Sequence, residues 1–452
     1  MGRVKITPIS GFPEYLPAER IVEQHFLDII RETFELHGFP SIETRAVEPV
    51  DRLLGKGGDA DKEIYGVTRL AGEETTDAEL GLHFDLTVPF ARYVLENAGH
   101  LAFPFRRHQV QKVWRGERPQ EGRYREFTQA DIDVVDVGEL APHFEAEIPL
   151  VMAEVFAKLP IGRMVIQVNN RKIPEGFYLG IGVTDVIGTL RIVDKLDKIG
   201  PAKVADLLVE SGLTREQADR CLALAAIRTE DLSFVERVRE LGVEHPTLDE
   251  GLEALTRVID TGMANAPGAL VADLRIARGL DYYTGTVYET QLVGHESWGS
   301  FCSGGRYDSL ASDGRTTYPG VGISIGVSRL LGLLLGHKML SASRSTPACV
   351  LVAVNDEDSR PTSTRVATAL RARGIPCEVA PKPAKFGKQI RYAERRGMPY
   401  VWFPGAGEPA DGSATGPDQV KDIRSGEQVD ADASVWTPPA EDLHPQILRA
   451  EA

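Results

Sequence analysis

The chain has 452 residues, 42% of them hydrophobic, which is enough for about two to four domains with full cores and excludes a disordered chain. Acidic residues number 66 against 51 basic ones, a formal net charge of −15, which argues against a protein that coats nucleic acid nonspecifically but leaves room for local basic patches. No apolar run approaches the roughly 20 residues of a membrane span. The cysteines form no C-x-x-C pair, so they predict reduced thiols in a cytoplasmic protein and neither a disulfide framework nor a zinc site: Cys221, Cys302, Cys349, Cys377.

The first hundred or so residues predict a helix, a strand, and a strand that runs into a helix. Apolar side chains at helical spacing predict the first helix over Pro17–His37, and Ser41–Val47 then has β character. Apolar and polar residues alternate at the start of Leu80–Val94, which predicts a half-buried strand. On such a strand Asp85 and Thr87 would share one face, because strand side chains repeat every two residues.

The stretch Lys112–Val135 predicts a β-hairpin with a long loop at Arg118–Gly122, where proline and glycine interrupt the β pattern. Four arginines and three acids lie on or beside this hairpin, more charge than a structural hairpin requires. Two interpretations follow: a solvated polar face, or a rigid platform whose guanidinium groups grip phosphates. The charged residues are Arg115, Glu117, Arg118, Arg123, Arg125, Asp131 and Asp133.

The middle of the chain predicts a helix over Ala141–Lys158, a strand over Met164–Val168, and then an almost wholly helical region from about Glu175 to Asn265. No chemical motif stands out in this helical region, which predicts a small bundle. Its expected helices are Val183–Ile199, Ala202–Ser211, Thr214–Leu224, Asp231–Leu241 and Leu248–Thr261.

Three segments rich in glycine follow the helical region. Strand character at Leu274 and Ile276 leads into Arg278–Thr286, which reads RGLDYYTGT, and Gly299–Asp308 reads GSFCSGGRYD. Pro319–Leu334 predicts a strand followed by a helix. It contains a G-x-S-x-G match around Ser324, and its glycine spacing only loosely matches a dinucleotide fingerprint.

After a polar linker at Lys338–Ser345, strands alternate with helices, which predicts a parallel sheet with flanking helices. Pro381–Arg396 concentrates basic residues, either as a solvated helix face or as a binding surface. The tail past Pro438 is expected to be poorly ordered. The expected elements are strands at Cys349–Val354, Cys377–Val379 and Tyr400–Phe403 and helices at Ser363–Arg373 and Gly387–Arg396.

The hairpin segment Arg115-Gly116-Glu117 with its RPQxGRYRxFxQ continuation resembles motif 2 of class II aminoacyl-tRNA synthetases, and with RGLDYYTGT it resembles the histidyl-tRNA synthetase family. Pro319–Leu334 resembles motif 3, and the first helix and strand resemble motif 1, which forms the dimer interface of the class, although Arg45 stands at the usual proline. The resemblance implies an α+β fold: an antiparallel sheet flanked by helices, a helical insertion and a C-terminal α/β anticodon-binding domain. The implied boundaries are 1–174 and 266–338 for the catalytic domain, 175–265 for the insertion, 346–437 for the C-terminal domain and 438–452 for the tail.

The resemblance also implies an ATP-dependent ligase of protein biosynthesis, a cytoplasmic homodimer that charges tRNA(His) with L-histidine through a histidyl-adenylate. Mg²⁺ is expected on the outer phosphates of ATP, with no dedicated protein ligand in the sequence. Arg278 and Arg115 would be catalytic, Arg115, Glu117, Arg123 and Arg329 would bind ATP, and Asp133 and Tyr283 would contact the imidazole. The full implied histidine site is Asp85, Thr87, Arg115, Gln129, Asp133, Arg278, Tyr282 and Tyr283.

Two other functions remain open. A histidine-binding regulatory paralogue of ATP phosphoribosyltransferase would share the core, but such paralogues usually lack the C-terminal domain and degrade the signature around Arg278. An esterase built on Ser324 would need an aspartate and then a histidine downstream, and only His337 and His444 follow it.

Overall fold

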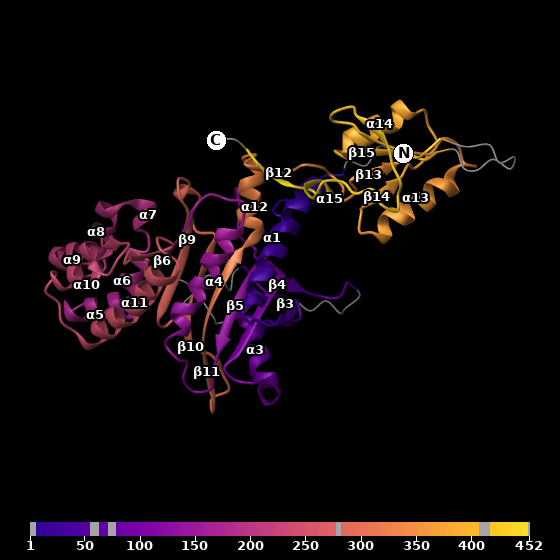
Figure 1. Cartoon of the computed structure of the whole chain (residues 1–452). Helices are drawn as coiled ribbons and strands as arrows, with labels where there is room; N and C mark the ends of the chain where they lie inside the picture. The colour runs from indigo at the N-terminus through magenta and orange to yellow at the C-terminus, as the bar shows by residue number, and fades with distance from the viewer. Residues whose placement is uncertain (1–5, 55–62, 71–77, 277–281, 406–415, 451–452) are drawn as a thin grey trace. The chain divides into compact units, whose positions relative to one another are not determined.

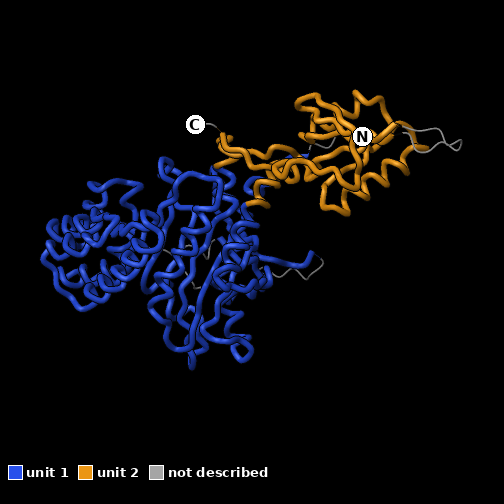
Figure 2. Tube along the Cα trace, viewed as in Figure 1, with its two compact units in different colours: residues 1–13, 26–333 blue, residues 14–25, 334–452 orange. Residues whose placement is uncertain are grey.

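The computed structural model describes residues 6–54, 63–70, 78–276, 282–405 and 416–450. The chain folds as two compact units (Figure 2). Unit 1 holds Met1–Pro13 and Phe26–Leu333, and unit 2 holds Glu14–His25 and Leu334–Ala452. Among the described residues, we find no helix with the length and apolar character that a membrane crossing requires.

Unit 1 is built on an eight-stranded sheet in the order β4-β5-β11-β10-β9-β6-β8-β7 (Figure 1). All neighbouring strands are antiparallel except β6 and β8, which confirms the predicted antiparallel sheet with one parallel pair added. The predicted hairpin is the β4–β5 pair. The strands are β4 Phe105–Trp114, β5 Glu126–Val135, β6 Met164–Asn170, β7 Arg228–Thr229, β8 Leu270–Asp273, β9 Thr286–Leu292, β10 Cys302–Ser312 and β11 Thr317–Gly326.

Helices pack on this sheet and bury its apolar side chains. The helix α4 (Phe144–Lys158) contacts β5, β6 and β11, and α3 (Thr87–Asn97) contacts β10 (Figure 1). One core cluster joins Phe90 of α3 to Tyr307 of β10 and Tyr318 of β11. Unit 1 also contains a small sheet and further helices: β1 Val47–Pro49, β2 Gly66–Val67, β3 Leu80–Leu82, α2 Val50–Leu53, η2 Ala98–His100 and η3 Glu296–Trp298, with α1 Pro17–Leu36 and α12 Val327–Gly336 each shared between the units.

The helical region predicted over 175–265 is present, but one of its helices was predicted wrongly. The segment Val183–Ile199 forms two helices, because after Val193 the chain makes a turn in which the Lys195 amide bonds the Ile192 carbonyl. Aspartate at position 194 has a low helix propensity, which is consistent with a break there. The helices are α5 Lys172–Gly180, α6 Val186–Val193, α7 Leu196–Ile199, α8 Pro201–Glu210, α9 Arg215–Ala225, α10 Ser233–Arg239 and α11 Pro246–Asn265.

Three strand predictions were also wrong. Of Ser41–Val47, only Val47 lies in a strand, β1, and Ser41 forms an isolated bridge with His108. The strand expected at the start of Leu80–Val94 ends at Leu82, and the helix α3 begins at Thr87. Residues 83–86 are all buried, so the alternation of apolar and polar residues does not correspond to a buried and a solvent-exposed face. Likewise β8 ends at Asp273, before Leu274 and Ile276, whose backbone carbonyls instead accept the side-chain amide of Asn169.

Unit 2 contains the predicted parallel sheet. The order is β14-β13-β15-β16-β17, in which β14, β13 and β15 are parallel. The sequence did not reveal β16 and β17, which extend one end of the sheet as antiparallel strands. The elements are β13 Val350–Val352, β14 Cys377–Val379, β15 Tyr400–Phe403, β16 Gln419–Asp422, β17 Gln428–Asp430, α13 Arg360–Ala372 and α14 Phe386–Arg396.

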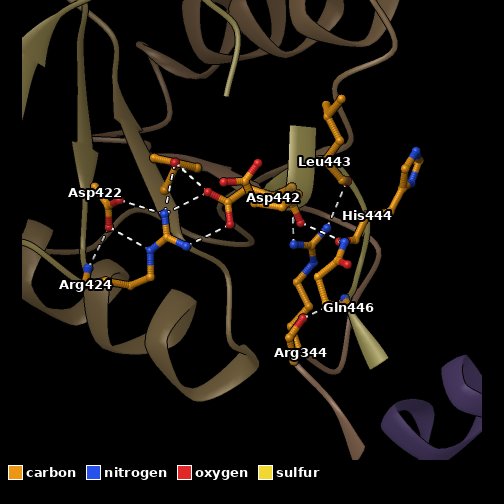
Figure 3. A network of polar contacts seen from close by, with 10 residues as sticks. Arg344, Asp422, Arg424, Asp442, Leu443, His444 and Gln446 are labelled. Atoms are coloured by element: carbon orange, nitrogen blue, oxygen red, sulfur yellow. Dashed lines mark hydrogen bonds and ion pairs between the residues drawn. The ribbon is translucent and has the colours of Figure 1, made fainter. Parts of the chain in front are cut away.

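The tail past Pro438 is ordered, contrary to the expectation from its position in the chain. It forms α15 (Ala440–Leu443) and β18 (Ile447–Arg449), and β18 pairs with β12 (Leu340–Ala342) inside the segment expected to be a linker. Arg424 donates to both carboxylate oxygens of Asp442 at 2.7 and 2.8 Å. The buried Arg344 guanidinium donates to the Asp442 and Leu443 carbonyl oxygens (Figure 3). These contacts hold residues 440–449, which we call the strap, against the rest of unit 2.

Candidate active site

A cavity of about 890 Å³ lies in unit 1 where the hairpin, α3, β9–β11, α12 and the helical insertion meet. It brings together residues that are up to 266 positions apart in the chain, from Glu63 to Arg329. Nine of the predicted site residues line it: Asp85, Thr87, Arg115, Glu117, Arg123, Gln129, Tyr282, Tyr283 and Arg329. Two do not: Arg278 lies outside the described residues, and Asp133 lies behind the cavity wall.

The acidic end of the cavity is organised by Asp85. Its Oδ1 accepts the Val88 amide at 3.0 Å at the start of α3, and its Oδ2 accepts the Tyr282 hydroxyl at 3.4 Å. Burial raises the pKa of the Asp85 carboxyl, while the Val88 amide and the Arg115 charge oppose that rise. Thr87 is the first residue of the same helix, so a helix N-terminus, rather than a strand, presents this pair.

Two arginines of the hairpin also line the cavity, with an acid between them. Arg115 donates through Nε to the Phe84 carbonyl at 2.9 Å and lies over the Phe127 ring, 5.1 Å from its centroid. The Glu117 carboxylate is 3.9 Å from the Arg115 guanidinium and 3.6 Å from that of Arg123. The backbone and ring contacts fix the Arg115 side chain, while the long ion-pair distances leave its charge available to an anionic ligand.

Arg329, in the first turn of α12, is a mostly buried cation. Its Nη2 donates to the Trp298 carbonyl at 2.6 Å and its guanidinium lies 5.8 Å from the Phe301 ring centroid. Its Nε has no hydrogen-bond partner among the described residues. Burial and the neighbouring Arg123 charge lower the pKa of this group. A desolvated guanidinium with a spare donor favours a bound anion.

Strands β5 and β11 form the floor. Gln129 and Asp131 line the cavity, and the Gln129 amide donates to the Ser324 hydroxyl at 2.8 Å. Asp133, one step further along β5, bonds the Arg107 guanidinium at 2.6 Å and the Tyr307 hydroxyl at 2.8 Å. Burial raises the pKa of Asp131 to about 7 and that of Asp133 to about 6, although the Arg107 charge lowers both.

Close approach of side chains to the sheet depends on glycine at two positions. A Cβ at Gly322 would lie 2.0 Å from Asp133 Oδ1, and a Cβ at Gly305 would lie 2.9 Å from the Tyr283 ring. Glycine therefore leaves the space in which Asp133 and Tyr283 lie.

Sequence reasoning missed two groups of cavity residues. Neither Asp131 nor its buried partner Arg107 was assigned a role in the site. The spacing of two residues between Asp131 and Asp133 was a usable signal, because it places both acids on one face of a strand. The helical insertion, in which no chemistry was expected, contributes Arg191 of α6, Lys198 of α7 and Lys195 between them, and Arg171 adds a fourth cation just before α5. No simple spacing separates these four from the many solvated basic residues of surface helices.

The esterase hypothesis fails on the same geometry. The Ser324 hydroxyl accepts the Gln129 amide, and no histidine lines the cavity among the described residues. A serine nucleophile needs an adjacent base to take its proton.

A model of the family "Histidyl-tRNA synthetase" matches residues 11–330, and a model described as "Anticodon binding domain" matches residues 348–434. The chain belongs to the histidyl-tRNA synthetase family. It is 60% identical to the histidine--tRNA ligase of Micrococcus luteus over 98% of both chains, and 59% identical to that of Cutibacterium acnes over 99% of both. The histidyl-tRNA synthetase structure from Nostoc sp. PCC 7120 matches with a TM-score of 0.84 at 36% identity, covering 95% of this chain and 98% of that one.

Family membership agrees with the class II fold and disfavours the regulatory alternative. A structure titled as an ATP phosphoribosyltransferase regulatory subunit/histidyl-tRNA synthetase from Bacillus halodurans also matches, with a TM-score of 0.70, but at 19% identity it shows the fold alone. In unit 2, a second cavity of about 520 Å³ lies beside α14 within the anticodon-binding match, and basic side chains of the predicted patch line it: Lys382, Lys388, Arg391 and Arg395.

Proposed function

We propose that this chain uses the unit 1 cavity to join histidine to ATP and then to transfer the histidyl group to the 3′ end of tRNA(His). The observation that carries this proposal is the pairing of three arginines, Arg115, Arg123 and Arg329, with an acidic end at Asp85 in one cavity. As a member of the histidyl-tRNA synthetase family with relatives of nearly its full length, the chain is a histidine--tRNA ligase.

The first step is an in-line displacement at the α-phosphate of ATP. A carboxylate oxygen of histidine forms a bond to the α-phosphorus, the bond to the bridging oxygen breaks, and pyrophosphate leaves with the electron pair. The carboxylate is already ionised, so no general base is needed. Two anions must meet, so preorganised cations lower the barrier. Arg115 and Arg278 are assigned to the α-phosphate, where Arg115 also contacts the histidine carboxylate.

The remaining assignments follow the distribution of charge in the cavity. Arg123 and Arg329 hold the outer phosphates, and the spare Arg329 Nε supports that assignment. Glu117 faces the adenine. At the acidic end, Asp85, Thr87 and Gln129 bind the ammonium group of histidine, and Tyr282 supports Asp85 through its hydroxyl. Tyr283 contacts the imidazole.

Mg²⁺ is proposed to enter as part of the ATP substrate, held mainly by phosphate oxygens and water, as is usual for this ion. Among the described residues no group of three or more His, Cys, Asp or Glu side chains gathers as a metal cage. The protein groups closest to the outer phosphates would then be cations, which share the neutralisation of charge with the ion.

Further proposals concern partners and assembly. The basic cavity beside α14 supports contact of unit 2 with the tRNA anticodon, and the cations of α6 and α7 support contact with its acceptor end. A cytoplasmic homodimer is proposed on the motif 1 segment and four buried free cysteines. Light scattering on the purified chain checks the dimer, and a monomer at working concentration contradicts it.

Histidine-dependent exchange of pyrophosphate into ATP tests the activity, with tRNA charging measured alongside. Arg278→Ala is expected to lower exchange by about 100- to 1,000-fold, the usual effect of removing one transition-state charge partner. Lys388→Ala on α14 is the matched control: exchange stays unchanged while tRNA charging falls. Exchange that survives Arg278→Ala would move the catalytic charge elsewhere, and histidine binding without exchange in the wild type would support the regulatory alternative.

A further inference from the structure

Beneath the histidine end of the cavity lies a buried charge cluster formed by Arg107, Asp131 and Asp133. Arg107 on β4 is directly paired with Asp133 on β5, so the two side chains share one face of the sheet. Asp131 precedes Asp133 by two residues and shares that face as well. All three side chains are at most 3% exposed.

The two carboxylates of this cluster are unequally satisfied. Asp133 is paired with the Arg107 guanidinium at 2.6 Å and with the Tyr307 hydroxyl at 2.8 Å. Asp131 Oδ2 is 3.9 Å from Arg107, beyond hydrogen-bond distance, and the Asp131 carboxylate interacts with the Ser324 hydroxyl. Its Oδ1, however, has no hydrogen-bond partner among the described residues. Asp133 is therefore committed to the protein, whereas Asp131 keeps a free acceptor.

The free acceptor belongs to the residue that lines the cavity. Asp131 contributes to the cavity wall, as Gln129 and Tyr283 do, whereas Asp133 does not. A buried carboxylate oxygen without a donor is unfavourable, and a ligand that supplies an N–H removes that cost. A neutral imidazole offers one N–H donor and one nitrogen acceptor.

We propose that Asp131 is a specificity residue that accepts the imidazole N–H of histidine, and that Arg107 and Asp133 are positioning residues that hold it. The proposal rests on the histidine site proposed above and reassigns the carboxylate contact from Asp133 to Asp131. The positive charge of Arg107 balances one of the two carboxylates. Because Arg107 lies on β4 and pairs with Asp133 on β5, it holds these two strands of the cavity wall together. Its guanidinium also lies 4.5 Å from the Phe90 ring centroid, which ties the cluster to α3.

Exchange kinetics with histidine and with 3-(2-thiazolyl)alanine test the proposal. The thiazole ring has a nitrogen acceptor but no N–H, so the wild type is expected to use it at least about 100-fold less efficiently than histidine. Asp131→Asn keeps the shape and can donate a hydrogen bond instead. It is expected to raise the KM for histidine about 100-fold, leave the KM for ATP unchanged, and shift the preference toward the thiazole analogue.

Asp133→Asn and Arg107→Met separate positioning from contact. Both are expected to raise the KM for histidine without shifting the preference between the two rings, because neither residue touches the ring. A change of less than twofold in the histidine KM of Asp131→Asn would overturn the proposal. A preference shift in Asp133→Asn instead would return the contact to Asp133.

Two measurements keep the outcomes distinct if a variant folds poorly. The unchanged KM for ATP and a cooperative thermal transition show that a variant is intact. The wild type alone also tests the proposal, because equal use of histidine and the thiazole analogue would contradict it. Absence of histidine-dependent exchange in the wild type would contradict the proposed function itself, a different result from any of these.

Discussion

Asp131 and Asp133 show how position on one strand gives two identical side chains different tasks. Both carboxyls are buried, and burial raises the pKa of both. The guanidinium of Arg107 lies 2.6 Å from Asp133 but 3.9 Å from Asp131, so the charge compensation is uneven. The pKa of Asp131 accordingly rises further, to about 7 against about 6 for Asp133.

This difference predicts a pH-dependent cost in stability. The pKa of Asp131 is higher in the folded state than in the unfolded state, so the native protein binds the extra proton between about pH 4 and pH 7, and ionising it there disfavours folding. Relative to the wild type, Asp131→Asn should therefore gain free energy of unfolding as pH rises from 5 to 8. Urea unfolding at both pH values measures this change.

Asp136→Asn, just past the end of β5 and partly exposed, is the matched control for the loss of one carboxylate from this part of the chain. A gain for Asp131→Asn that is the same at pH 5 and pH 8 would mean that Asp131 titrates like an ordinary carboxyl.

At the scale of the element, α3 combines structure with binding. Its N-terminus needs an acceptor for orphan amides, and Asp85 supplies one to Val88 at 3.0 Å. The same carboxylate lines the cavity and accepts the Tyr282 hydroxyl. One side chain therefore fixes where the helix begins and provides the negative charge for an ammonium group.

Two substitutions separate these tasks. Asp85→Asn keeps a capping oxygen and removes the charge, so stability should change by less than about 0.5 kcal/mol while the KM for histidine rises at least about tenfold. Asp85→Ala should add a loss of about 1 kcal/mol in the free energy of unfolding. Chemical denaturation and exchange kinetics measure both quantities. Equal stability of the two variants would show that the Val88 contact does not cap α3.

The strand β11 makes a sharper steric prediction. A Cβ at Gly322 would meet Asp133 Oδ1 at 2.0 Å and the Ile132 carbonyl oxygen at 2.8 Å, so Gly322→Ala must displace the buried acid. We expect a loss of about 1–3 kcal/mol in the free energy of unfolding and weakened histidine use. Gly326→Ala on the same strand meets nothing closer than 3.4 Å and should be nearly neutral in stability. Thermal unfolding compares the two, and similar losses would contradict the steric argument.

The sequence predicted the long elements with strong periodicity and failed where tertiary contacts decide. The β4–β5 hairpin, α4, α12 and the parallel strands of unit 2 have local patterns that fix them. Leu82–Leu86 alternates in the sequence, but the strand ends at Leu82 and α3 begins at Thr87, where the Asp85 carboxylate accepts the Val88 amide of the first helical turn. Most of the cavity residues could be predicted because they belong to sequence motifs. The free acceptor on Asp131 could not, because it depends on the distance between Asp131 on β5 and Arg107 on β4, which no local pattern encodes.

At the scale of the whole molecule, the strap completes unit 2. Asp442 accepts from Arg424 (Figure 3) and from the Tyr400 hydroxyl, each at 2.7 Å. The strand β18 adds a ladder with β12. The Arg344 guanidinium donates to the carbonyl oxygens of Asp442 and Leu443 in the strap and to that of Thr346 outside it. These bonds replace the water that a frayed tail would bind.

Asp442→Ala should lower the free energy of unfolding of unit 2 by about 1–2 kcal/mol, a value reduced by the partial exposure of Arg424. Histidine-dependent exchange should be unchanged, because every residue assigned to that step lies in unit 1. Limited proteolysis and exchange assays check the two statements. Asp430→Ala, on the exposed strand β17, serves as the control and should leave cleavage rates unchanged. Unaltered proteolysis of the Asp442 variant would show that the strap adds no stability.

The pairing of β12 with β18 also sets an order of events during synthesis. Leu340 leaves the ribosome 109 residues before its partner Arg449, the difference between the two paired positions. At about 5–20 residues per second, β12 waits roughly 5–20 s for its partner strand. Over that interval the nascent chain presents an unpaired strand edge next to a folding domain, the kind of edge that other chains can join. A chaperone that covered the segment around β12 would protect the growing chain over that interval.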